Sequence, residues 1–401
     1  MHALVLVACA RTSGRAKPGA PAPSTAQAPA PVAATPSRAA TIVPNPNAPK
    51  VLVIATGGTI AGVQDAPGTL GSYRAGALTA EQIIASVPEL SRYAKVETEQ
   101  FSNVASTLVT PEMWVKLAKR INVVLQRNDL AGVVVTHGTD RLEETAFFLY
   151  LTIRSQKPVV VVGAQRPATG ISPDGPVNLL AAVRTAASPK SVDKGVMVVM
   201  DDRILSARES RKLYQRTGGF STGDMGMLGV VASQGPEFFF APVRRFGTRS
   251  EFDLAGVDTL PRVELTMSYP GGTGQTFTTN PKGVVVATTG MTAAEGQTYR
   301  ALRQTGVVVV TSFTSGENVN GGGGDDPSSI AARRDSAAPR DSTVRRDSTV
   351  RRDSTARPAV PPAPPAVTAL HLTATKARIL LMLALTKTKD PREIQRMFNE
   401  Y

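Results

Sequence analysis

The chain has 401 residues, with 45 Lys and Arg against 32 Asp and Glu, and a formal net charge of +13 at pH 7. Residues 1–49 carry four cations and no acid, and residues 331–366 carry eight Arg and four Asp, so these two segments supply +8 of that charge and the rest is only mildly basic. With few aromatic residues as well, nucleic-acid binding is not indicated, and one cysteine with three histidines excludes a disulfide framework within the chain and implies no metal.

The amino-terminal segment, residues 1–49, has the composition of a signal and a tether. A short apolar run is followed by a tract rich in Ala and Pro, and Leu6-Val7-Ala8-Cys9 resembles a bacterial lipobox. We therefore expect lipidation at Cys9, which would attach the protein to a membrane, and a periplasmic or otherwise extracytoplasmic location. The run has no preceding Lys or Arg, so an ordinary cysteine beside a wrongly assigned start site is the alternative.

From residue 50 to residue 240 the pattern predicts a catalytic α/β domain. Val-rich runs of strand length alternate with segments of helical composition, which is typical of a doubly wound, mostly parallel sheet. The expected strands cover residues 51–55, 132–136, 159–163 and 196–200. The expected helices cover residues 79–87, 111–126 and 143–155.

The remaining residues predict a smaller parallel α/β domain at 262–401, after a linker at 241–261. Strands are expected at 263–266, 284–288 and 307–312, and helices at 293–304, 375–385 and 391–398. Arg-Asp-Ser-Thr recurs before the last two helices, with an Asp every six residues from Asp335 to Asp353. Six residues are too short for the repeat of a helical solenoid, and mixed charges without large apolar residues cannot bury a core, so we expect a disordered insertion at 321–366.

Three local patterns resemble catalytic or nucleotide-binding signatures and are set aside. Residues 219–223 match G-x-S-x-G, but a polar stretch precedes them instead of the buried strand that a nucleophile elbow needs. The glycines at 321–324 lack the Lys of a phosphate loop. The Gly57-Gly58 pair lacks the spacing of a dinucleotide-binding turn.

Two threonines follow predicted strands directly. Thr59 comes after Gly57-Gly58, and Thr139-Asp140 comes after the strand at 132–136. Ligands bind at the carboxyl ends of parallel strands, and a hydroxyl needs a base or a cation to act as a nucleophile. One site could hold both threonines, with Thr59 as the candidate nucleophile; the alternative is that Thr59 only caps its turn.

Together these motifs resemble the bacterial type II L-asparaginases. The matching segments are ATGGTIA at 55–61, THGTD at 136–140, PVVVVGAQRP at 158–167, DGPVN at 174–178, Ala207-Arg208 with Lys212, and KARILLMLALTKTKDPREIQRMFNEY at 376–401. The resemblance implies an amidohydrolase that converts L-asparagine to L-aspartate and ammonia, with minor glutaminase activity, without a cofactor, as a homotetramer built from two dimers.

The resemblance also implies a role for each site residue. Thr59 would be the nucleophile that forms an acyl-enzyme, and Tyr73 would help to activate it. Thr139, Asp140 and Lys212 would form the second catalytic group, with Asp140 also holding the substrate ammonium, whereas His137 would be structural. The substrate would contact Ser106, Thr107, Thr139, Asp140 and Ala164.

One part of the family's site is altered in this sequence. The family completes its site with polar and acidic residues of a neighbouring subunit, but Ala293 stands where an Asn is expected, and the nearest acids are Glu317, Asp325 and Asp326. We expect Glu317 to substitute. Two alternatives stay open: a catalytically weak, amino-acid-binding surface lipoprotein, and an ammonia-supplying subunit of a tRNA-dependent amidotransferase.

Overall fold

The computed structural model describes residues 42–69, 71–314 and 363–401. Cys9, the tether up to residue 41 and residues 321–362 of the expected insertion lie outside these ranges. The predictions made for them, like the predicted domain boundaries, stay predictions.

An eight-stranded sheet organises the first part of the described chain, in the order β12-β11-β8-β7-β6-β5-β1-β4. The five strands from β7 to β4 pair in parallel, and the other three join antiparallel. Their bounds are β1 (Lys50–Gly57), β4 (Lys95–Val104), β5 (Leu130–Thr136), β6 (Val159–Val162), β7 (Val196–Met200), β8 (Arg203–Ser206), β11 (Gly229–Ala232) and β12 (Gly235–Phe238).

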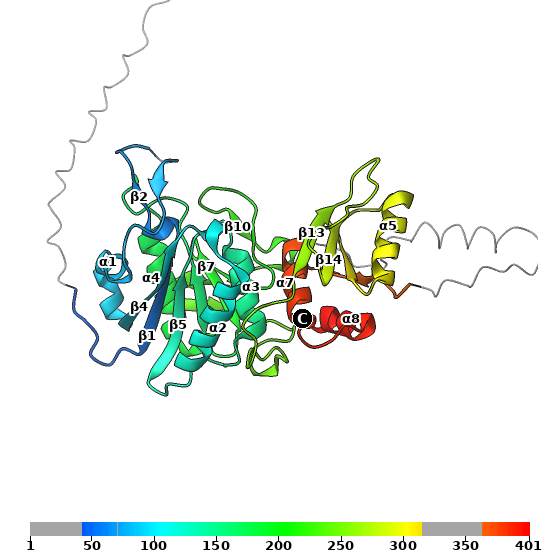
Figure 1. The fold of residues 1–401 in the computed structure, drawn as a ribbon. Coiled ribbons are helices and arrows are strands. Elements are labelled where there is room, and N and C mark those ends of the chain that lie inside the picture. Colours follow the sequence, from blue (N-terminus) through cyan, green and yellow to red (C-terminus); the bar gives the residue numbers. More distant parts are fainter. Residues whose placement is uncertain (1–41, 70, 315–362) are drawn as a thin grey trace, which may run out of the picture. The chain divides into compact units, whose positions relative to one another are not determined.

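Helices cover both faces of this sheet (Figure 1). On one face lie α2 (Pro111–Val124) and α3 (Leu142–Thr152), and on the other lie α1 (Ala80–Ala85) and α4 (Gly175–Ala187). Two apolar cores result, one on each side. The central strands are buried on both faces, as their continuous runs of Val predict.

A second, four-stranded sheet is parallel throughout, in the order β13-β14-β15-β16. Its strands are β13 (Val263–Met267), β14 (Gly283–Ala287), β15 (Val308–Ser312) and β16 (Val367–Thr368), and its helices are α5 (Ala293–Gln304), α7 (Ala374–Ala384) and α8 (Pro391–Glu400). Helix α7 packs against α3 as well as against the small sheet, so its residues belong to the same apolar core as α2 and α3. The predicted fold class, a larger mostly parallel sheet and a smaller parallel α/β unit, is confirmed.

Several elements were not predicted. Helix α4 starts within the DGPVN segment, and β4, β8, β11, β12 and β16 add strands to the two sheets. Two short hairpins, β2 (Val63–Gln64) with β3 (Tyr73–Arg74) and β9 (Arg211–Lys212) with β10 (Phe220–Ser221), stand apart from both sheets. Both hairpins carry residues that the sequence assigned to the site.

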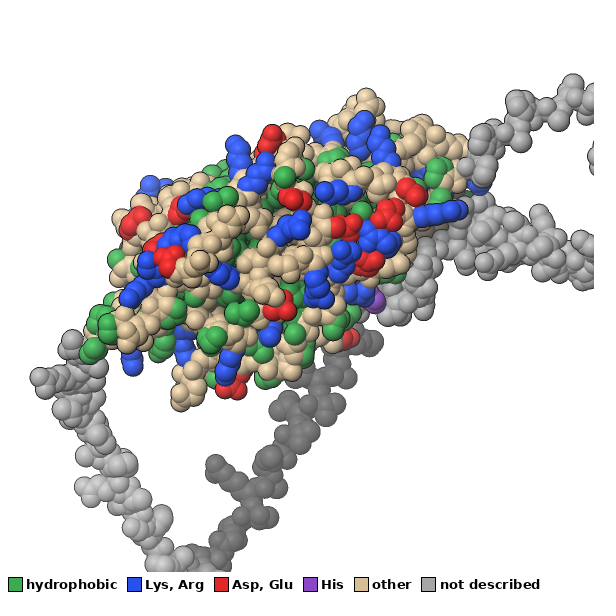
Figure 2. Space-filling view, turned by 90° about the horizontal axis from the view of Figure 1, so that it is seen from below, with side chains coloured by type: hydrophobic (Ala, Val, Ile, Leu, Met, Phe, Trp, Pro, Cys, Tyr) green, Lys and Arg blue, Asp and Glu red, His purple; other side chains and the backbone are tan. Residues whose placement is uncertain are grey.

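The surface is mixed in charge on the face drawn in Figure 2, where basic and acidic side chains are intermingled. Within the described ranges, no helix is both long enough and apolar enough to cross a bilayer.

Candidate active site

The site is built where β1 and β5 end side by side. These strands pair in parallel with Ala55 opposite Thr136, so the residues that follow them meet at one edge of the sheet. Gly57 and Gly58 have φ of +106° and +82°, values that side chains other than glycine rarely adopt. A Cβ on Gly58 would lie 2.2 Å from the Cα of Gly138, so the two turns pack backbone against backbone.

Thr59 follows this contact and pairs with Tyr73. Its side chain is buried in a single 3-10 turn, and its Oγ lies 2.7 Å from the Tyr73 hydroxyl oxygen. Tyr73 is on β3, and its ring edge also lies against Gly62, where an added Cβ would be 2.8 Å from the ring. The hairpin therefore brings a second hydroxyl to the nucleophile candidate.

Thr139, Asp140 and Lys212 form a second polar group. The Lys212 ammonium donates to Thr139 Oγ at 2.8 Å and to Asp140 Oδ1 at 2.6 Å. The Thr139 residue is buried, and the Lys212 side chain is 13% exposed, whereas that of Asp140 is 53% exposed. The ammonium is thus available to stabilise negative charge on Thr139, while the carboxylate faces solvent, from which a substrate cation would arrive.

The predicted substrate-binding residues differ in burial. Ser106 is buried, and its Oγ is so close to Gly138 that a Cβ there would approach within 2.8 Å. Thr107 beside it is exposed, and Ala164 is fully buried after β6. The structure thus brings Ser106 to the two threonine turns and places Ala164 at the end of the sheet strand next to β5.

Two residues of the DGPVN segment, whose role sequence reasoning missed, hold the turn around Ala164. The Asp174 carboxylate accepts from the backbone N–H groups of Gln165 and Arg166, at 2.9 and 2.8 Å. Asn178, one helical turn later, donates to the Gly163 carbonyl and to Asp174. The spacing of four residues, which places both side chains on one face of a helix, was the available signal.

His137 is buried and hydrogen-bonded through both ring nitrogens. Its Nδ1 donates to the Gly138 carbonyl at 2.7 Å, because a carbonyl can only accept, so Nε2 accepts from the Thr145 hydroxyl at 3.0 Å. Burial lowers the pKa of His137 to about 4, against a smaller raising effect of the Gly138 carbonyl. The neutral ring therefore fixes the backbone just before Thr139.

The expected contribution from a partner subunit falls mostly outside the described residues. Glu317, Asp325 and Asp326 all lie in the undescribed range, and Ala293 is the first residue of α5, next to its N-cap Thr292. Among residues 42–69, 71–314 and 363–401, no group of three or more His, Cys, Asp or Glu is arranged to hold a metal ion.

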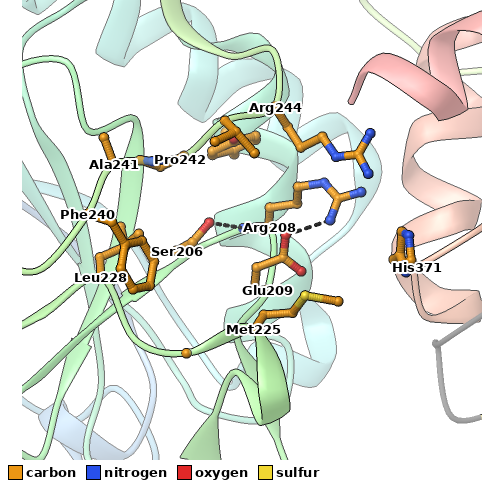
Figure 3. A pocket seen from close by; sticks show the side chains of 13 residues that line it. Ser206, Arg208, Glu209, Met225, Leu228, Phe240, Ala241, Pro242, Arg244 and His371 are labelled. Atoms are coloured by element: carbon orange, nitrogen blue, oxygen red, sulfur yellow. Dashed lines mark hydrogen bonds and ion pairs between the residues drawn. The ribbon is translucent and has the colours of Figure 1, made fainter. Parts of the chain in front are cut away.

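A separate pocket of about 370 Å³ is lined in part by Arg208 and Glu209, which belong to the turn that precedes Lys212 (Figure 3). Arg208, Glu209 and Arg244 point into it from one side, and Phe240 and Leu228 form an apolar wall. Arg208 donates to Glu209 and, from Nε, to the carbonyl oxygen of Tyr401, which ties this turn to the end of α8.

Comparisons with known proteins agree with this architecture. Residues 50–244 match the family model described as "Asparaginase, N-terminal". The chain is 39% identical to L-asparaginase 2 of Bacillus subtilis strain 168, over 88% of this chain and 87% of that protein. It is 36% identical to the glutaminase-asparaginase of Pseudomonas fluorescens biotype A, over 88% and 90%.

A solved structure is similar as well. The crystal structure of a probable cytoplasmic L-asparaginase from Campylobacter jejuni aligns with a TM-score of 0.75 at 34% identity, covering 88% of this chain and all of that one. The chain therefore belongs to the asparaginase family.

Proposed function

We propose that this protein is an amidohydrolase that converts L-asparagine to L-aspartate and ammonia, with Thr59 as the nucleophile. One observation carries the proposal: two buried threonine hydroxyls, each with its own polar partner, follow neighbouring parallel strands whose turns are in backbone contact. Relatives named as L-asparaginases support the same reaction.

In the first step the Thr59 Oγ attacks the carbon of the side-chain amide. Thr59 passes its proton to the Tyr73 oxygen, and Tyr73 passes its own proton to the amide nitrogen, which leaves as ammonia when the carbon–nitrogen bond breaks. The acyl group is then an ester on Thr59. Tyr73 is well placed for this relay because its hydroxyl lies 2.7 Å from Thr59.

In the second step water hydrolyses the ester. The Lys212 ammonium favours loss of the Thr139 proton to solvent, and the Thr139 oxygen then takes a proton from the water as the water oxygen bonds to the ester carbon. When the carbon–oxygen bond of the ester breaks, the Thr59 oxygen takes that proton from Thr139, which restores both groups and releases L-aspartate. Asp140 holds the substrate ammonium and Ser106 its carboxylate, with Thr107 and Ala164 completing the walls. These roles need no cofactor.

The test is ammonia release from L-asparagine and from L-glutamine by the wild type and by Thr59→Ala. We expect asparagine to be the better substrate, with slower release from glutamine, which the glutaminase-asparaginase relative makes chemically reasonable. Thr59→Ala should lose most activity with an unchanged circular dichroism spectrum and melting temperature. Near-normal turnover by that variant would exclude Thr59 as the nucleophile.

Assembly as a homotetramer of paired dimers is part of the proposal. Large apolar side chains are exposed on the described part of the chain, among them Phe239 (60%), Val243 (89%) and Tyr269 (63%), and exposed apolar surface of this kind favours association. Light scattering after size-exclusion chromatography measures the mass directly. A monomeric mass with full activity would contradict it.

We also propose an extracytoplasmic location with a lipid on Cys9, which rests on the lipobox-like sequence alone. The wild type, expressed with its native upstream start, should partition with membranes, and Cys9→Ser should be released. Equal partitioning of the two forms would contradict the anchor.

A further inference from the structure

Lys376 is a lysine placed where a charge is costly. Only 1% of the residue is exposed, and it occupies the first turn of α7, where the helix dipole is unfavourable for a cation. Burial lowers its pKa to about 8, while Glu143 and Glu209 act to raise it. An apolar residue would be the ordinary choice at a position facing this core.

The partners of its ammonium are three backbone carbonyls of one turn. Nζ donates to Ala207 at 3.2 Å, to Arg208 at 2.7 Å and to Ser210 at 2.5 Å. An ammonium has three N–H groups, so all three can be used in these bonds. The turn connects β8 to β9 and is 169 residues from Lys376 at Ala207, so helix α7 holds a distant part of the chain.

This turn leads directly into Lys212. Ser210 is two residues before it, and the Lys212 ammonium is the group that bonds to Thr139 and Asp140. The backbone N–H of Lys212 donates to the carboxylate of Glu143 on α3. The side chains of Arg208 and Glu209, which belong to the same turn, line the pocket of about 370 Å³ drawn in Figure 3. The backbone carbonyls of the turn bond to Lys376 instead.

We propose that Lys376 is a positioning residue that sets Lys212 against Thr139 by binding the carbonyls of residues 207, 208 and 210. The inference rests on the proposed function, because it gives Lys376 an effect on catalysis only through Lys212. In this proposal Lys376 makes no contact with the substrate. It fixes the backbone from which the long Lys212 side chain reaches the site.

A double-mutant cycle tests this proposal, with kcat and KM for L-asparagine measured for Lys376→Met, Lys212→Met and the double variant. Methionine keeps the unbranched shape and removes the three hydrogen bonds. We expect Lys376→Met to lower kcat about a hundredfold, as small displacements of catalytic groups do, with KM within about threefold because Asp140 keeps its carboxylate. In the Lys212→Met background the same change should lower kcat by less than about threefold.

The matched control is Leu383→Ala, a truncation of a side chain that is also 1% exposed on α7. It should lower the melting temperature and leave kcat unchanged. If Lys376→Met does not fold, Lys376→Gln, whose amide can still donate two of the hydrogen bonds, takes its place in the cycle with a smaller expected loss.

Two results would overturn this proposal and leave the proposed function intact. One is a folded Lys376→Met or Lys376→Gln variant with the kcat of the Leu383→Ala control. The other is a full further loss in the Lys212→Met background, which would show that Lys376 acts elsewhere. Wild-type kcat in the Lys212→Met variant by itself would instead refute the role of Lys212 in the proposed function, and this proposal with it.

Discussion

The indole N–H of Trp114 on α2 donates to the Thr145 hydroxyl on α3, at 2.8 Å. Because that hydroxyl oxygen accepts from Trp114, its own proton is directed to His137 Nε2, and the opposite ring nitrogen donates to Gly138. A single direction of hydrogen bonding thus runs from a helix to the turn before Thr139. The chain of bonds needs a neutral imidazole, since Nε2 must accept.

Stability should therefore depend on pH through His137. Its pKa is about 4 in the folded protein and 6.5 when unperturbed, so the unfolded chain binds the proton first as the pH falls. The contribution of the neutral ring to the free energy of unfolding is fully present above about pH 6.5. It is lost as the pH falls towards 4, by roughly 3 kcal/mol for this difference in pKa. Denaturant unfolding of the wild type and of His137→Gln across this pH range measures the loss. If the free energies of unfolding of the two proteins changed with pH in the same way, the prediction would be refuted.

The contact between Gly58 and Gly138 should tolerate no side chain. Gly58→Ala places a Cβ 2.2 Å from backbone, and the rigid turns on both sides cannot move apart without breaking the sheet edge. We expect a loss of at least about 3 kcal/mol in the free energy of unfolding, or failure to fold. Gly68→Ala is the matched control, because Gly68 has φ +84° with nothing within 4 Å, and should cost only about 1 kcal/mol for the left-handed backbone. Equal losses for the two would contradict the steric argument.

Removal of the Tyr73 hydroxyl should separate catalysis from stability. Tyr73→Phe keeps the ring against Gly62 and deletes the partner of Thr59, so kcat should fall about a hundredfold or more, as for other losses of acid–base groups. The melting temperature should change little. Tyr93→Phe, which removes a hydroxyl from a ring that stacks with Arg184 outside the site, should leave kcat unchanged. A kcat for Tyr73→Phe equal to that of Tyr93→Phe would mean that Thr59 is activated by another group.

Asp174 should contribute to stability and to substrate binding together. Asp174→Asn places an amide N–H opposite the N–H groups of Gln165 and Arg166, so at least one charge-assisted bond is lost, at about 2 kcal/mol. KM should also rise, because the turn carries Ala164. Asp258→Asn, whose carboxylate is 89% exposed and pairs with Lys119, should change the unfolding free energy by less than about 0.5 kcal/mol. An Asp174→Asn variant as stable as this control would show that the turn does not depend on the Asp174 carboxylate.

Much of the fold could be predicted from the sequence because the central strands are buried on both faces and read as unbroken apolar runs. Strand β4 escaped prediction because it is an edge strand, paired only with β1, and its sequence KVETEQFSNV is largely polar. Helix α4 escaped prediction because it begins with Gly175-Pro176, a pair that more often marks a turn. The short strand β16 follows a Pro-rich stretch, and its two residues are too few to give a strand pattern.

The threonine turns could be predicted because Thr59 and Thr139 each directly follow a glycine in the sequence itself. What the sequence could not show is which distant groups support them. Three side chains hydrogen-bond to backbone atoms that are between 8 and 169 residues away: Glu143, Asp174 and Lys376. Such contacts leave no local pattern in the sequence. Their roles depend on how the helices pack, which only the folded chain determines.

The packing of α7 between the two sheets has a consequence for how the protein folds. The apolar face of α3 is covered by residues that the ribosome adds much later, so a growing chain holds an uncovered hydrophobic surface until α7 emerges. Closing contacts over so long a separation is slow. Chaperones that bind exposed apolar segments should therefore retain this chain during synthesis, and release should coincide with docking of α7.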